Sequence, residues 1–253
     1  MPKAAHRRTA ERGARCRRAE WLSADVARAL CANLFETRLH GHGLPGDSLG
    51  NVAVKDWLTD AVDALEIGRR LGDSVIVIGT STGGTLAAWL ATLPRTMRPH
   101  MSTLVLVSPN FGPRDPMAAV LTLPWASRVL PAFIPTREWT AGNDEQRRYW
   151  TMRYPSTALF PMQAMVEHVR GRSVDGYDIP TLTFYNTDDP VVDAARTIAW
   201  LDRVQAASSA RVERVVVTPK PGEDGHVIAD RIVAPSQTAM LRDRIVAFVK
   251  QQR

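Results

Sequence analysis

Residues 79–83 have the sequence Gly-Thr-Ser-Thr-Gly, and the central serine, Ser81, is the residue in this chain best suited to act as a nucleophile. The apolar run 75–78 before it is typical of a β-strand, and the run 85–93 after it is typical of a helix. A strand-to-helix turn projects a serine hydroxyl clear of the backbone if the flanking positions carry almost no side chain. The glycines at both ends of the segment are expected to meet that need, and Gly84 to let the helix approach the sheet. The pattern predicts a serine poised for acyl transfer.

A serine hydroxyl needs a general base at neutral pH, so the chain must also supply a carboxylate and a histidine after the serine. Three histidines follow Ser81, namely His100, His168 and His226. Only His226 also follows a carboxylate at the end of an expected strand. The loop after the expected strand 213–217 delivers it to the carboxyl edge of the sheet, where ligands of open α/β sheets bind.

The candidate acid lies in the loop that leaves the expected strand 181–185. Asp189 is our choice, and Asp188 and Asp193 are the alternatives in the same loop. If Asp189 is the acid, we expect Asp188 to cap the loop and Asp193 to lie at the start of the following helix.

The turn around Ser81 also predicts where negative charge is stabilised. The first N–H groups of the helix, that of Thr82 foremost, are aimed at the space where an oxyanion forms during acyl transfer. In this interpretation His226 takes the serine proton, Asp189 orients and stabilises the imidazolium, and the Thr82 N–H binds the oxyanion.

Four motifs together resemble one known family. They are RLHGHG at 38–43, GTSTGG at 79–84, IPTLTFYNTDDPVV at 179–192 and GEDGHVIAD at 222–230. In this order and spacing they resemble the α/β-hydrolase family, and within it bacterial carboxylesterases and monoacylglycerol-lipase-like serine hydrolases, from about residue 20 to the C-terminus. The resemblance implies Ser81 as nucleophile, His226 as base and Asp189 as acid. It favours Asp189 over the two neighbouring aspartates because the family's acid is the last Asp before an x-Val-Val step.

The sequence departs from the family at its beginning. Family members start with two or three further strands, and a His-Gly turn after the third carries a backbone N–H that completes the oxyanion hole. The only His-Gly steps here lie at 40–43, where the family has its second Gly-rich loop. We therefore expect an α/β-hydrolase fold that lacks the family's first strands and its usual first oxyanion element.

The order of the expected elements indicates an α/β fold with a mainly parallel sheet and helices on both faces. Strands are expected at 32–37, 75–78, 104–107, 181–185 and 213–217, and helices at 19–30, 56–71, 85–93, 193–206 and 236–251. The hydrolase domain is expected to span residues 21–253. Within it, residues 112–178 are too many for one crossover and are expected to form a helical lid. Four apolar side chains of this segment are candidates to line an acyl pocket: Met117, Leu121, Trp125 and Phe133. The alternative is that half of them pack the lid onto the body of the domain.

Charge is concentrated in the first twenty residues. The chain has a net charge of +6, and residues 1–20 hold seven Lys or Arg against two Glu, a net +5. We expect this segment to be a disordered leader, and the near-neutral remainder argues against a nucleic-acid partner.

No signal peptide, membrane span, metal-ligand spacing or phosphate-binding loop is recognisable, so we expect a cytoplasmic protein without metal or cofactor. Cys31 is expected to be a small core residue.

These observations predict a serine hydrolase that cleaves carboxylic esters of short to medium acyl chains, with monoacylglycerols among the candidates. Apolar and methionine side chains in the lid favour an aliphatic acyl group. Two alternatives stay open: a serine peptidase or amidase on the same fold, and a catalytically impaired scaffold that lacks the usual oxyanion loop. The partner is expected to be a small-molecule ester, and the oligomeric state is left open.

Overall fold

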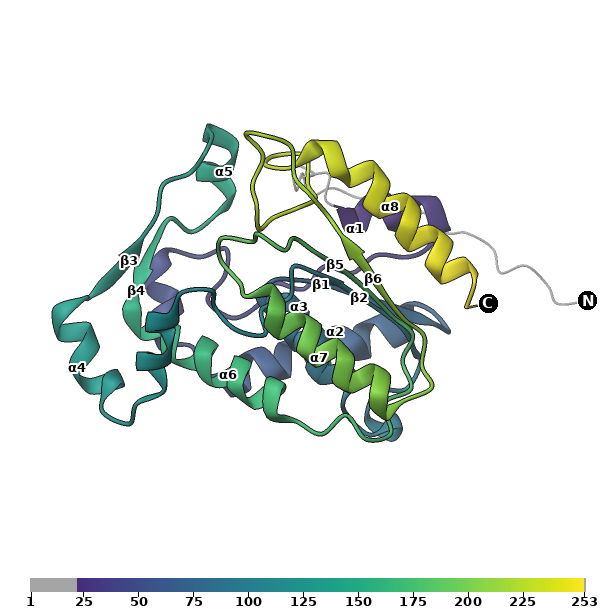
Figure 1. Cartoon of the computed structure of the whole chain (residues 1–253), viewed down its shortest axis with the longest axis horizontal. Coiled ribbons are helices and arrows are strands. Elements are labelled where there is room, and N and C mark those ends of the chain that lie inside the picture. Colours follow the sequence, from purple (N-terminus) through teal and green to yellow (C-terminus); the bar gives the residue numbers. More distant parts are fainter. Residues whose placement is uncertain (1–21, 253) are drawn as a thin grey trace, which may run out of the picture.

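The computed structural model describes residues 22–252, and its centre is a parallel sheet of four strands in the order β1-β2-β5-β6 (Figure 1). The strands are β1 (Val75–Thr80), β2 (Met101–Val107), β5 (Thr181–Tyr185) and β6 (Val212–Val216). All three neighbouring pairs are parallel. The expected α/β class with a mainly parallel sheet is confirmed.

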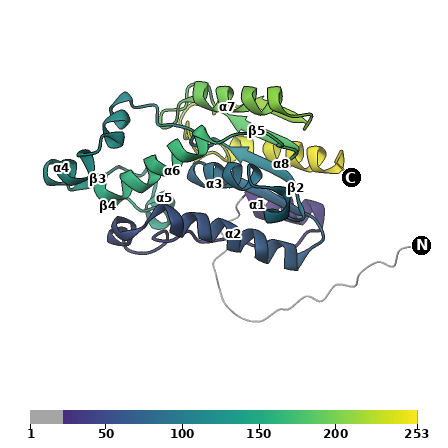
Figure 2. The same cartoon turned by 90° about the horizontal axis from the view of Figure 1, so that it is seen from below.

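Helices cover both faces of this sheet (Figures 1 and 2). One face carries α1 (Leu22–Leu30) and α8 (Pro235–Lys250), and the other carries α2 (Val54–Leu71), α3 (Thr82–Ala91), α6 (Leu159–Gly171) and α7 (Ala194–Ala207). The alternation of side chains along β2 explains this division, because Leu104 and Leu106 join the core under α2 and α3 while Val105 and Val107 join the core under α8. The stripe of α2 that was expected to face the core, Trp57, Ala61 and Leu65, is buried.

Two expectations near the start of the described chain are wrong. Residues 32–37 form no strand, because β1 pairs with β2 alone and leaves them without a ladder partner. Cys31 is not a core residue: it is exposed just after α1, with a φ of 52°. The expected leader, residues 1–20, lies outside the described residues.

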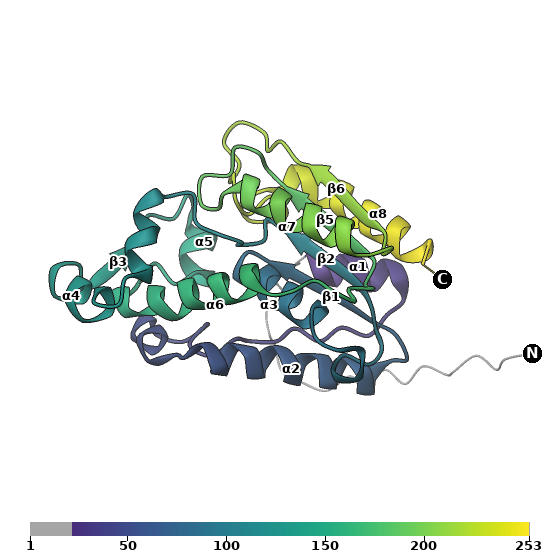
Figure 3. The same ribbon diagram turned by 60° about the horizontal axis from the view of Figure 1, so that its bottom comes forward.

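Most of the long segment between β2 and β5 lies beyond one end of the sheet (Figure 3), and its last helix, α6, returns to cover one face. Its elements are η3 (Pro116–Thr122), α4 (Ala126–Phe133), β3 (Thr136–Glu138), α5 (Asp144–Tyr149), β4 (Arg153–Pro155), η4 (Ser156–Ala158) and α6. The sequence patterns did not predict the short antiparallel pair β3–β4. Two further 3-10 helices are η1 (Gly46–Asn51), which lies against β4, and η2 (Arg95–Met97). Within residues 22–252, no helix combines the length and apolar character that crossing a membrane requires.

Candidate active site

Ser81 occupies the turn between β1 and α3 in a strained backbone conformation. Its φ is 52° and its ψ is −119°, a region that non-glycine residues rarely adopt. Three backbone hydrogen bonds hold it there: the Ser81 N–H donates to the Val107 carbonyl at 3.0 Å, and the Ser81 carbonyl accepts from the N–H groups of Thr85 and Asn110. The sheet and the helix therefore fix the serine between them.

The glycines around the turn have unequal roles. A Cβ at Gly79 would lie 2.4 Å from the Gly83 carbonyl oxygen, and one at Gly84 would lie 2.9 Å from the Pro109 Cβ. Both positions therefore require glycine, as expected. Gly83 differs from the expectation, since a Cβ there would meet nothing within 4 Å. The turn therefore needs glycine at Gly79, at the end of β1, and at Gly84, where α3 meets Pro109.

His226 connects the serine to a carboxylate. Its Nε2 lies 2.8 Å from the Ser81 Oγ, and its Nδ1 lies 2.8 Å from the Asp189 Oδ2. The His226 side chain is only 10% exposed and the Asp189 side chain 1%. The structure thus brings the three predicted residues, from three separate loops, into one hydrogen-bonded chain largely shielded from water.

Asp189 is the only one of the three candidate aspartates that reaches this histidine. Its second oxygen, Oδ1, accepts from the N–H groups of Val191 and Val192 at 2.8 and 3.0 Å, so both oxygens of the buried carboxylate have partners. Asp188 is exposed. Asp193 caps α7, where its side chain accepts from the Ala195 N–H. The position of Asp193 at the start of α7 agrees with the role expected for it, whereas the loop cap expected for Asp188 stays a prediction.

Three further side chains support the acid and histidine loops, and the sequence patterns did not single them out. Asn186 donates from Nδ2 to the Gly225 carbonyl, and its Oδ1 accepts from the Asp188 N–H. The Arg114 guanidinium donates to the Asp189 carbonyl at 2.8 Å. The third is Asp224, whose Oδ1 accepts from the N–H groups of residues 226 and 227. Only their positions in the sequence could have indicated two of these residues: Asn186 directly follows a strand, and Asp224 precedes the histidine by two residues.

Thr82 is the first residue of α3, and its N–H is the predicted oxyanion donor. The bond from the Thr85 N–H to the Ser81 carbonyl closes the first turn of the helix, so the Thr82 N–H has no intrahelical acceptor. The His40–Gly43 turn, which contains the His-Gly steps, is fastened to α2: the His40 N–H and Nδ1 contact the Asp60 carboxylate, and the Trp57 Nε1 donates to the His40 carbonyl. The role of Thr82 stays a prediction.

The four predicted acyl-pocket residues all lie on η3 and α4 or at their ends. Met117, Trp125 and Phe133 are 67%, 52% and 79% exposed, and Leu121 is half-buried. They form apolar surface on the insertion and do not belong to either hydrophobic core cluster. Their contact with an acyl chain stays a prediction.

Asp230 is a buried carboxylate four residues after the histidine. Its Oδ1 accepts from the N–H groups of Ile232 and Val233, whereas its Oδ2 has no hydrogen-bond partner among the described residues. Burial raises the pKa of the Asp230 carboxyl above its usual value. The folded chain therefore holds this proton at a higher pH than the unfolded chain does, which makes its stability depend on pH.

A strained serine at a strand-to-helix turn, bonded to a histidine and a buried aspartate, is the arrangement that serine hydrolases share. The model of the Alpha/beta hydrolase family matches residues 12–235, and the chain belongs to this family. No match was found among curated protein sequences.

Solved structures of several hydrolases are similar to this chain. One is from a study of LipS and LipT, two metagenome-derived lipolytic enzymes, with a TM-score of 0.65 and 18% identity over 91% of this chain and 86% of that one. Monoglyceride lipase from Saccharomyces cerevisiae has a TM-score of 0.59 and 12% identity, over 84% of this chain and 75% of that one. Est1E from Butyrivibrio proteoclasticus, with ferulic acid bound, has a TM-score of 0.53 and 15% identity, over 85% of this chain and 74% of that one. At these identities the likeness extends to the fold alone.

Proposed function

We propose that this α/β hydrolase cleaves carboxylic esters through an acyl-enzyme on Ser81. The observation that carries the proposal is the unbroken chain of hydrogen bonds from the Ser81 Oγ through the imidazole of His226 to the Asp189 carboxylate. A serine hydroxyl becomes a nucleophile when a neighbouring base accepts its proton, and the base works best when a third group fixes its tautomer.

The proposed reaction has two halves. In the first, the Ser81 Oγ attacks the ester carbonyl carbon while the His226 Nε2 takes its proton, and the Thr82 N–H donates to the oxygen that becomes negative. The tetrahedral intermediate collapses, the alcohol leaves with the proton from the imidazolium, and the acyl group stays on the serine. In the second, water gives its proton to His226 and attacks the acyl-enzyme, releasing the carboxylic acid and restoring the serine.

Aliphatic esters of short to medium chain length, monoacylglycerols included, are the proposed substrates. Support comes from the apolar side chains of η3 and α4, Met117, Trp125 and Phe133. The similar solved structures include enzymes that are named lipolytic and a monoglyceride lipase, so esters are the first substrates to test.

The test is a series of p-nitrophenyl esters from acetyl to decanoyl, compared with aminoacyl p-nitroanilides. If an apolar surface encloses the acyl chain, each buried methylene contributes up to about 0.8 kcal/mol, or roughly fourfold in kcat/KM. We expect medium chains to react faster than acetyl, and no turnover by Ser81→Ala. A flat profile would contradict the acyl preference, and faster turnover of the anilides would favour the peptidase or amidase. Absence of turnover with every substrate would favour the impaired scaffold.

A further inference from the structure

The insertion, residues 112–178, is hydrogen-bonded to both of the loops that carry Asp189 and His226. Its first residues lie along the acid loop, residues 186–193. The start of α5 lies against the histidine loop, residues 217–234 (Figure 1). Because a triad works only when its members are held at the right distances, these contacts bear on the reaction itself.

The first residues of the insertion pair with the acid loop. An isolated antiparallel bridge joins Pro113 to Val192. Two backbone hydrogen bonds of 2.9 Å flank it, one from the Asp193 N–H to the Gly112 carbonyl and one from the Arg114 N–H to the Val191 carbonyl. The insertion therefore begins as a short strand-like partner of the loop that presents the acid.

The side chain of Arg114 adds a bond to the acid residue itself. Its Nη1 donates to the carbonyl of Asp189 at 2.8 Å. The carboxylate of Asp189 is held by its own loop, because it accepts from the N–H groups of Val191 and Val192. The insertion thus fixes the main chain of the acid while the loop fixes its carboxylate.

Asn143 makes the corresponding contact with the histidine loop. It is the N-cap of α5, and its Oδ1 accepts from the Gln146 N–H at 2.8 Å. This bond orients the amide, whose Nδ2 donates to the Ile232 carbonyl at 3.0 Å. An ion pair of 2.8 Å between Glu145 and Arg231 joins the same two segments.

Hydrogen bonds inside the histidine loop continue from residue 232 to the histidine. The Asp230 carboxylate accepts from the N–H groups of Ile232 and Val233. The Val233 carbonyl accepts from the Asp224 N–H at 3.0 Å, and the Asp224 Oδ1 accepts from the His226 N–H at 2.7 Å. We therefore expect a displacement of residue 232 to move His226 as well.

The insertion is fixed to the body of the protein at its base. The β3–β4 pair flanks α5 in the sequence, and β4 lies so close to η1 that a Cβ on Gly46 would be 1.9 Å from the Arg153 carbonyl oxygen. At its end, α6 joins the main core through Met165 and Val169. A segment anchored in this way can hold a loop in place, whereas a freely moving flap cannot.

We propose that the insertion positions the triad: Arg114 holds the loop of Asp189, and Asn143 holds the loop of His226. Both are positioning residues, since each acts through the backbone of a catalytic loop. Their roles rest on the proposed hydrolysis at Ser81. They are separable from the proposed binding of an acyl chain, because an acetyl ester offers a single methyl group to an apolar surface.

Two variants remove these contacts and keep the other functions of each side chain. Arg114→Met retains an apolar stem and the backbone bond to Val191 but has no side-chain donor. Asn143→Asp retains an oxygen that caps α5 but cannot donate to the Ile232 carbonyl. We expect kcat to fall about tenfold with both p-nitrophenyl acetate and p-nitrophenyl octanoate, with KM within about twofold of the parent. Arg114→Lys keeps a cationic donor and should recover most of the loss.

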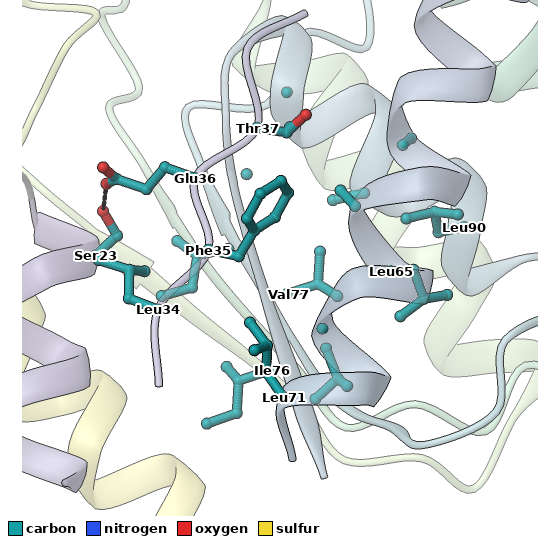
Figure 4. A pocket seen from close by; sticks show the side chains of 18 of the residues that line it. Ser23, Leu34, Phe35, Glu36, Thr37, Leu65, Leu71, Ile76, Val77 and Leu90 are labelled. Atoms are coloured by element: carbon teal, nitrogen blue, oxygen red, sulfur yellow. Dashed lines mark hydrogen bonds between the residues drawn. The ribbon is translucent and has the colours of Figure 1, made fainter. Parts of the chain in front are cut away.

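Two control variants remove surface contacts that join neither catalytic loop. Arg147→Ala removes an ion pair with Asp144 inside α5. Ser23→Ala removes the hydroxyl that donates to Glu36 at an apolar groove of about 530 Å³ between β1 and residues 32–37 (Figure 4). Both should keep the parental kcat. Circular dichroism and thermal unfolding verify that every variant is folded.

The rate of fluorophosphonate labelling at Ser81 separates the positioning role from the proposed function, because it reports activation of the serine without an ester. We expect folded Arg114→Met and Asn143→Asp to label about tenfold more slowly than the parent. Labelling at the parental rate, or a loss confined to KM for the octanoate, would overturn the role assigned to that residue. A parent chain that neither labels nor turns over an ester would overturn the proposed function, and the positioning role with it.

Discussion

The side-chain amide of Asn186 donates a hydrogen bond of 2.9 Å to the carbonyl oxygen of Gly225, the residue before His226. Asn186 begins the loop that carries Asp189, so this single bond joins the loop of the acid to the loop of the histidine. The distance between the Asp189 carboxylate and the imidazole therefore depends on a side chain that hydrogen-bonds to neither of these two groups.

Replacement of Asn186 by alanine should slow the reaction without weakening substrate binding. Misplacement of a catalytic group by about 1 Å can cost up to about 10² in rate, so we expect kcat to fall between about 10- and 100-fold with little change in KM. Steady-state kinetics with a p-nitrophenyl ester measures both constants. Asp188→Ala, which removes an exposed side chain from the same loop, is the control. An unchanged kcat in Asn186→Ala would show that the two loops keep their positions without this bond.

The Ser81–His226 hydrogen bond predicts that the two residues act as a unit. Ser81→Ala and His226→Ala should each remove nearly all turnover, and the double variant should be no slower than either single variant. The measurement is kcat for all three proteins with one ester. Full additivity of the two losses on a logarithmic scale would contradict the assignment.

The identity of the acid is tested by three matched substitutions in one loop. Asp189→Asn removes the charge beside the imidazole and favours the wrong tautomer, which costs about 10⁴ in kcat in a comparable triad. Asp188→Asn changes an exposed side chain, and Asp193→Asn keeps an oxygen that can cap α7, so both should retain most activity. A larger loss in either of these two than in Asp189→Asn would move the acid to that residue.

Two glycines of the turn should respond differently to alanine. In Gly79→Ala the new methyl group lies 2.4 Å from the Gly83 carbonyl oxygen, and relief of such overlap typically costs about 1–3 kcal/mol. Gly83→Ala enters open space near the start of α3, where alanine is favoured over glycine by up to about 1 kcal/mol. Urea unfolding of the two variants checks the ranking. Equal destabilisation would mean that the space beside Gly83 is filled in solution.

Asp230→Asn should stabilise the protein at neutral pH but not in acid. Burial raises the pKa of this carboxyl in the folded state, so the folded chain holds the proton over a range in which the unfolded chain has released it. Stability therefore falls as pH rises from the unfolded pKa, about 4, through the raised folded pKa. The amide is neutral throughout, so its advantage should be present at neutral pH and vanish in acid. Thermal unfolding as a function of pH measures this difference, and a difference independent of pH would contradict it.

Sequence patterns were sufficient for the parts of the molecule that local rules determine. The strand before Ser81 and the strand 181–185 are short apolar runs with clear stops, and the structure has both. The order of residues along the chain was sufficient to select Ser81 and His226, because few residues of the right type follow the serine at the ends of strands. The preference for Asp189 over Asp188 and Asp193 came from the family resemblance. Their hydrogen-bonded geometry agrees with that selection.

Other features of the fold and the site depend on contacts with residues far away in the sequence, which the pattern of one segment does not reveal. Residues 32–37 have the composition of a strand, but a strand also needs a partner at its edge, and the structure places a groove there. Gly83 looked essential because it completes a familiar spacing, although the space beside it is open. Asn186 and Asp224 support the site through backbone atoms of other residues, and such contacts leave no spacing signature.

The most direct test of the account is labelling of the full chain with a fluorophosphonate, followed by peptide mapping. These probes react with a serine only when a base activates it. We expect one modified peptide, with the adduct on Ser81, and loss of labelling in His226→Ala although the serine is still present. No adduct at Ser81, or equal labelling of His226→Ala, would contradict the claim that this histidine activates this serine.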